Sequence, residues 1–73
     1  MTPEAFQAWL KSMKASGRAR SDAECGRLLG ITSTSVVSLK SKGADRRTAL
    51  ACRALSQGLE PWDDDQMPEA TGP

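Results

Sequence analysis

The chain has 73 residues, enough for one small domain, and contains neither an apolar run that could span a membrane nor a signal-peptide pattern, so we expect a soluble, cytoplasmic protein. With two cysteines and no histidine it lacks the ligands of a zinc site, so we expect no metal and no cofactor. The net charge of +1 is unevenly spread: residues 1–56 hold all ten Lys and Arg and sum to +6, whereas residues 57–73 sum to −5. A basic body is typical of nucleic-acid-binding proteins.

The first predicted helix spans residues 3–15. Thr2 is placed to cap it, and Pro3 takes the first helical position, where its missing N–H costs nothing. Its apolar residues recur at helical spacing and predict one buried stripe: Phe6, Trp9, Leu10 and Met13.

A second helix is predicted over residues 21–29, after a basic loop. Ser21 with Glu24 three residues later is the pattern of a capping box. The third helix is predicted over 33–42, capped by Thr32 or Ser33 and ended by a glycine.

The fourth predicted helix spans residues 46–57, begins after Asp45 and carries an apolar stripe of Leu50, Ala51, Ala54 and Leu55. Cys25 and Cys52 lie in predicted helices beside apolar residues, and we expect reduced, buried thiols. We therefore predict an all-α, four-helix domain over residues 1–62, followed by a disordered acidic tail over residues 63–73.

The segment from residue 22 to residue 41, DAECGRLLGITSTSVVSLKS, has the spacing of a helix-turn-helix. Gly26 is a small residue at the expected helix crossing, and Gly30 stands at the turn, where glycine adopts left-handed dihedrals cheaply. Val36 and Leu39 are three residues apart, so they share one face of the third helix and fix it to the core. The opposite face is left free, and in such proteins that face usually enters the DNA major groove.

This segment resembles the helix-turn-helix of small Cro/C1-type (XRE) repressors of phages and mobile elements. The flanking TPEAFQAW, RRTALACRAL and GLEPW are similar to compact four-helix members of that group, and the resemblance covers residues 2–62. It implies a sequence-specific repressor that binds double-stranded DNA as a homodimer on an inverted repeat near its own promoter. Anti-CRISPR-associated autoregulators are one kind of protein that the resemblance includes.

By position, the resemblance assigns base reading to residues of the third helix and its cap: Thr32, Ser33, Thr34, Ser35, Val37, Ser38 and Ser41. Two features depart from the family. Its opening position is often a glutamine that contacts phosphate, but here it is Asp22, and a fifth helix is missing. A carboxylate repels phosphate, so we expect Arg20 or the backbone amides of the second helix to hold that strand.

Hydroxyl groups dominate the predicted recognition face, which lacks the Arg, Asn or Gln needed for bidentate base recognition. We therefore expect direct contacts with the bases to supply only part of the sequence specificity. Bridging water, DNA shape and the binding of two half-sites are expected to supply the rest. Phosphate contacts are expected from basic residues on both sides of the third helix: Arg18, Arg20, Lys40, Lys42, Arg46 and Arg47. The expected dimer interface is the fourth helix with Leu55, Leu59 and Trp62.

Two other functions stay open: a protein-interaction module that keeps a helix-turn-helix shape, and a DNA-targeting accessory subunit. An enzyme is not expected, because no His or Tyr is present and no Ser or Cys has a general base placed near it. We also expect no small-molecule ligand. The acidic tail is open to three interpretations: a solubilising segment, a competitor of DNA for the basic face, or a docking segment for a protein partner.

Overall fold

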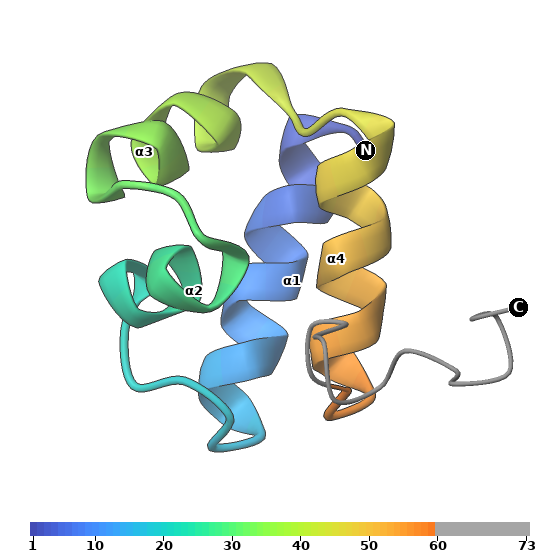
Figure 1. Ribbon diagram of the computed structural model, residues 1–73. Helices are drawn as coiled ribbons and strands as arrows, with labels where there is room; N and C mark the ends of the chain where they lie inside the picture. The colour runs from blue at the N-terminus through green and yellow to red at the C-terminus, as the bar shows by residue number, and fades with distance from the viewer. Residues whose placement is uncertain (60–73) are drawn as a thin grey trace, which may run out of the picture.

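The computed structural model describes residues 1–59, and within them the chain forms four helices and no strand (Figure 1). The helices are α1 (Pro3–Ala15), α2 (Asp22–Leu29), α3 (Ser33–Lys42) and α4 (Arg46–Ser56). The all-α, four-helix prediction is confirmed. Two bounds differ by one residue, because Ser21 is the cap of α2 rather than its first residue and Gln57 is the cap that follows α4.

Each helix is preceded by a capping residue whose side-chain oxygen accepts a hydrogen bond from the backbone N–H three residues later. This bond satisfies an amide that has no partner within the helix. In α3 this residue is Thr32, not Ser33. The capping oxygens belong to Thr2 (3.1 Å), Ser21 (3.2 Å), Thr32 (3.1 Å) and Asp45 (2.9 Å).

The predicted stripe of α1 forms the centre of the core. Phe6, Trp9, Leu10 and Met13 are buried together with residues from the other helices and loops, namely Ala19, Cys25, Val36, Ala44 and Cys52. The indole N–H of Trp9 donates to the carbonyl of Cys52 and to the hydroxyl of Ser56, both at 3.0 Å. These two bonds hold α4 against α1 and satisfy the one polar group of the indole ring.

The predicted apolar stripe of α4 is partly wrong. Leu50 is 58% exposed, and the buried residue of this helix is Cys52. Leu55 packs against the core from a half-buried position. The apolar residues of α4 are interspersed with polar ones around most of the helix and not confined to one narrow stripe, so periodicity alone does not determine which side faces α1 and α2.

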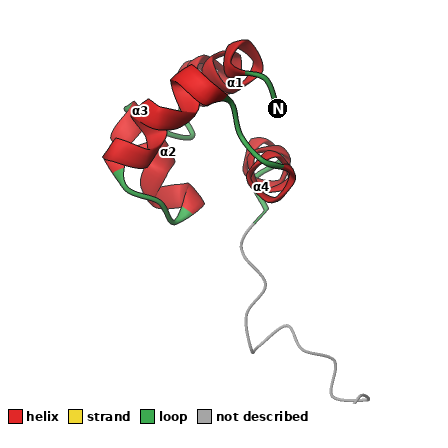
Figure 2. Ribbon diagram, turned by 90° about the horizontal axis from the view of Figure 1, so that it is seen from above, coloured by secondary structure: helices red, strands yellow, loops and turns green. Residues whose placement is uncertain are grey.

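The start of the chain is joined to the turn between α3 and α4. The amino group of Met1 donates to the carbonyl of Ala44 (3.0 Å), and the Ala44 N–H donates to the carbonyl of Met1 (2.9 Å). Gly43, at φ 86°, lies so close to Met1 that a side chain at this position would collide with its carbonyl. Seen from above, α2 and α3 lie on one side and α4 on the other (Figure 2), and α4 also packs against α2.

None of the helices in residues 1–59 is long and apolar enough to cross a bilayer. The expectations for Trp62, for a domain boundary at residue 62 and for a disordered tail over residues 63–73 lie outside the described residues.

Candidate nucleic-acid interface

Helices α2 and α3 form one tightly packed unit around Gly26. A Cβ at this glycine would lie 2.7 Å from Cγ2 of Val36 and 3.3 Å from the carbonyl oxygen of Ile31. Gly30 ends α2 in the left-handed region at φ 79°, and the Ile31 N–H donates to the carbonyl of Gly26 at 2.9 Å. The crossing and turn roles predicted for the two glycines are confirmed.

The outward face of α3 follows from this packing. Val36 is 1% exposed and Leu39 is half-buried, so the side of α3 that carries them is covered. The opposite side of the helix presents Ser33, Thr34, Val37 and Ser41 to solvent. At 62% exposure, Val37 is the most accessible of the large apolar residues among residues 1–59.

The other predicted base-reading residues lie differently. The Thr32 hydroxyl accepts from the N–H of Ser35 and donates to the Ser35 hydroxyl at 3.0 Å, so the cap already engages it. Ser35 and Ser38 are half-buried and line a hollow between α3 and the start of α4. Apart from the capping residue Thr32, which is also exposed, the solvent-facing part of the predicted set is the group of four residues on the outward face.

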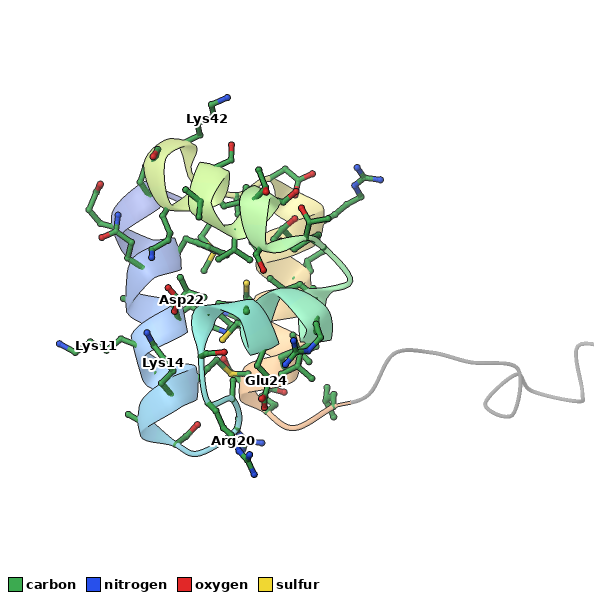
Figure 3. All side chains as sticks on the ribbon, turned by 90° about the vertical axis from the view of Figure 1, so that its left-hand side faces the viewer. Lys11, Lys14, Arg20, Asp22, Glu24 and Lys42 are labelled. Carbon is green, nitrogen blue, oxygen red and sulfur yellow. The ribbon has the colours of Figure 1, made fainter. Side chains whose placement is uncertain are left out.

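An ion-pair cluster joins three helices beside this unit. Asp22 at the start of α2 lies 2.8 Å from the ammonium group of Lys14 on α1 and 2.8 Å from that of Lys40 on α3. These contacts from Lys14 and Lys40 hold the pKa of Asp22 below its ordinary value of 3.8. Figure 3 shows Asp22 and Lys14 on the same side of the molecule.

Sequence reasoning missed Lys14 and treated Lys40 only as a phosphate ligand. No local pattern marks this pairing, because the three residues lie on different helices that meet only in the folded chain. Lys40 keeps 40% of its side chain exposed, so it remains accessible while paired.

The predicted phosphate-binding residues do not form one continuous patch. Lys42 at the end of α3 and Arg20 before α2 project from opposite ends of the molecule (Figure 3). The Arg18 guanidinium lies over Gly58 instead, where it would be 2.8 Å from a Cβ at that glycine.

Arg46 and Arg47 point to different sides of α4. Arg47 is 3.6 Å from Asp45 and lines a hollow with Ile31 and Leu29 of the α2–α3 unit. Arg46 lines a groove on the α1 side of the helix. Only Arg47 of the two therefore stands beside the helix-turn-helix.

The predicted dimer residues are only partly accessible. Leu55 is half-buried against the core, whereas Leu59 is 55% exposed. Cys25 and Cys52 are buried free thiols, as expected, and burial is the main cause that raises both pKa values, that of Cys52 to about 11. Within residues 1–59, no group of three His, Cys, Asp or Glu side chains is placed to hold a metal ion.

Comparison with known proteins gave no match to a family model, to a curated protein or to a solved structure.

Proposed function

We propose that this protein is a sequence-specific transcriptional repressor that binds double-stranded DNA by inserting α3 into the major groove. The observation that supports this most directly is the contact of Val36 with Gly26. It fixes α3 by one side and leaves an uncovered side that is free of acidic residues. A helix presented in this way, followed by Lys40 and Lys42 in its last turn, suits the shape and the charge of the groove.

The chemistry of the outward face indicates what kind of site it would bind. The side chain of Val37 and the methyl group of Thr34 suit contact with the thymine methyl group, and the hydroxyls of Ser33 and Ser41 can pair with base edges or phosphate. These short side chains would give only modest sequence specificity through direct contacts with the bases. Discrimination would also depend on bridging water, on DNA deformability and on a second half-site bound by a second copy.

Phosphate contacts would come from both ends of the helix-turn-helix. Arg20 stands before α2, while Lys42 and Arg47 stand at the end of α3 and the start of α4. Lys40 would contribute less than a free lysine, because Asp22 already neutralises part of its charge. In this proposal the protein acts in the cytoplasm as a homodimer on an inverted repeat near its own promoter, where it blocks polymerase.

The test is fluorescence anisotropy with the DNA upstream of the protein's own gene, a scrambled duplex as control, and two salt concentrations. The informative variant is Ser33→Ala/Val37→Ala, because both residues face solvent; Ser12→Ala on the exposed side of α1 is the matched control. We expect the double variant to lose part of its preference for the upstream DNA, by less than the roughly 1–3 kcal/mol that one bidentate base contact supplies, while keeping its affinity for scrambled DNA.

Equal binding to both duplexes, unchanged in the double variant, would contradict base reading by α3 and leave only electrostatic attraction. No binding at low salt would overturn the DNA proposal altogether and favour a protein-interaction module.

A further inference from the structure

The cluster of Lys14, Asp22 and Lys40 presents positive charge to solvent and partly covers its acid. The ammonium of Lys14 lies 2.8 Å from Oδ1 of Asp22, and that of Lys40 lies 2.8 Å from Oδ2. The lysine side chains are 42% and 40% exposed and that of Asp22 is 31% exposed, with its Oδ1 shielded from solvent. The cluster therefore has a net charge of +1, and two ammonium groups form most of the surface that it offers to a ligand.

The two lysines are held in place by contacts among three helices. Asp22 on α2 receives one ammonium from α1 and the other from α3, and the side-chain amide of Gln7 on α1 donates to the backbone carbonyl of Lys40 at 2.7 Å. An ammonium group has three N–H donors, and the carboxylate does not engage all of them. Each ammonium therefore keeps donors for a further acceptor.

The chemistry of the cluster suits a phosphate group. Two ammonium groups that already meet at one carboxylate are close enough to donate to two oxygens of a single phosphate, in charge-assisted hydrogen bonds. Their position favours a phosphate of the DNA backbone, because Lys14 and Asp22 lie between Lys42 at one end of the molecule and Arg20 at the other (Figure 3). The cluster thus stands in the gap between two of the phosphate contacts that the proposed repressor would make.

We propose that Lys14 and Lys40 together bind one phosphate of the DNA backbone, with Asp22 as the residue that positions both. The proposal rests on the proposed DNA-binding function and adds to it a contact from α1. It also gives Asp22 two opposing effects. The carboxylate stabilises the folded chain through both ion pairs, but it cancels one of the two positive charges that attract DNA.

The experiment measures binding of the full chain to a scrambled duplex by fluorescence anisotropy over a range of salt concentrations, because phosphate contacts need no particular sequence. We expect Lys14→Gln to make the slope of log K against log salt shallower by about 1. Asp22→Asn should make it steeper by about 1 and tighten binding at low salt. Lys11→Gln is the matched control, because Lys11 is exposed on the same helix but points away from Asp22 (Figure 3), and it should leave the slope nearly unchanged.

A stability measurement separates this role from a purely structural one. Lys14→Gln and Asp22→Asn each break ion pairs of the same cluster, so both variants should unfold at a lower urea concentration than wild type. Their effects on DNA binding should nevertheless have opposite signs. Lys14→Arg keeps the positive charge and should keep the salt dependence of the wild type.

NMR of the lysine side chains locates the contact directly. On titration with the scrambled duplex, we expect the Nζ signals of Lys14 and Lys40 to shift while that of Lys11 does not. Inorganic phosphate at the same concentration of phosphate groups should shift them much less, because a free phosphate is not held near the cluster by neighbouring contacts as a duplex is.

Three results would overturn the proposal. The first is a slope for Lys14→Gln equal to that for Lys11→Gln. The second is weaker binding of Asp22→Asn than of wild type, which would leave the cluster a structural role alone. The third is an equal response to inorganic phosphate and to the duplex, which would assign the cluster to free phosphate.

These results are distinct from failure of the repressor proposal. Each of the three can occur in a protein that prefers the DNA upstream of its own gene, and the repressor proposal would then stand without this contact. Equal binding to upstream and scrambled DNA would contradict base reading by α3 and leave the phosphate contact intact. The absence of any duplex binding at low salt would overturn both.

Discussion

The Cβ that Gly26 lacks would lie 2.7 Å from Cγ2 of Val36, so α2 and α3 meet at a distance that only a glycine permits. We expect Gly26→Ala to lower the free energy of unfolding by about 1–3 kcal/mol, because the methyl group must displace a side chain that is fully buried. Urea unfolding followed by circular dichroism measures the change.

The control for this prediction is a double-mutant cycle with Val36→Ala, which removes the opposing methyl groups. We expect the double variant to be more stable than the sum of the single effects implies, because the clash is relieved. Additive effects would show that Gly26 is not required by contact with Val36.

Asp22 should make the fold sensitive to acid. Its pKa is lowered by Lys14 and Lys40, so the ion pairs stabilise the native state above pH 3.8 and this contribution is lost as the pH falls through the lowered pKa of the folded state. Thermal unfolding between pH 2 and pH 7 should show a steeper loss for wild type than for Asp22→Asn.

At neutral pH, Asp22→Asn should cost about 1 kcal/mol, since both ion pairs are partly exposed. Glu4→Gln serves as the control, because Glu4 is an exposed acid in the first turn of α1. An unchanged acid profile in Asp22→Asn would argue against the cluster.

Arg46 and Arg47 are adjacent in sequence but should differ in their effect on DNA binding. Arg47 lies on the side of the helix-turn-helix, whereas Arg46 lines the groove next to α1. If the repressor proposal holds, Arg47→Gln should reduce the slope of log K against log salt by about 1, and Arg46→Gln should change it little. Equal slopes for the two variants would contradict this division of α4.

The two cysteines should be unreactive toward thiol reagents in the folded protein. Both are buried, and desolvation raises both pKa values, so the reactive thiolate is disfavoured. We expect reaction with a thiol reagent at pH 8 to require unfolding, so that its rate rises with urea. Fast labelling without denaturant would contradict the burial of Cys25 and Cys52.

The same burial predicts a loss of stability in alkali. The pKa of Cys52 rises from 9.0 to about 11 on folding, so stability is intact below pH 9 and falls as the pH rises from 9 to about 11, where the unfolded thiol ionises first. Cys52→Ala should show a shallower decline over this window, even if it is less stable at neutral pH.

The sequence by itself determined the features that arise within a few residues. The start of a helix depends on a capping side chain and a backbone amide three residues apart, as at Thr2 and Ser21. The turn at Gly30 needs a residue that can adopt the left-handed backbone conformation, which glycine does readily. The stripe of α1 was equally evident, because polar residues separate its apolar ones.

Only the tertiary structure decided which way α4 faces. Leu50 and Cys52 are both apolar and two positions apart, so they lie on different sides of the helix. The hydrogen bonds of Trp9 to Cys52 and Ser56 turn the Cys52 side toward the core and leave Leu50 exposed. This orientation of α4 also places Arg46 and Arg47 on different sides of the helix. The pairing of Asp22 with Lys14 and Lys40 likewise joins three helices, and no local pattern encodes which long side chains meet once the helices have packed.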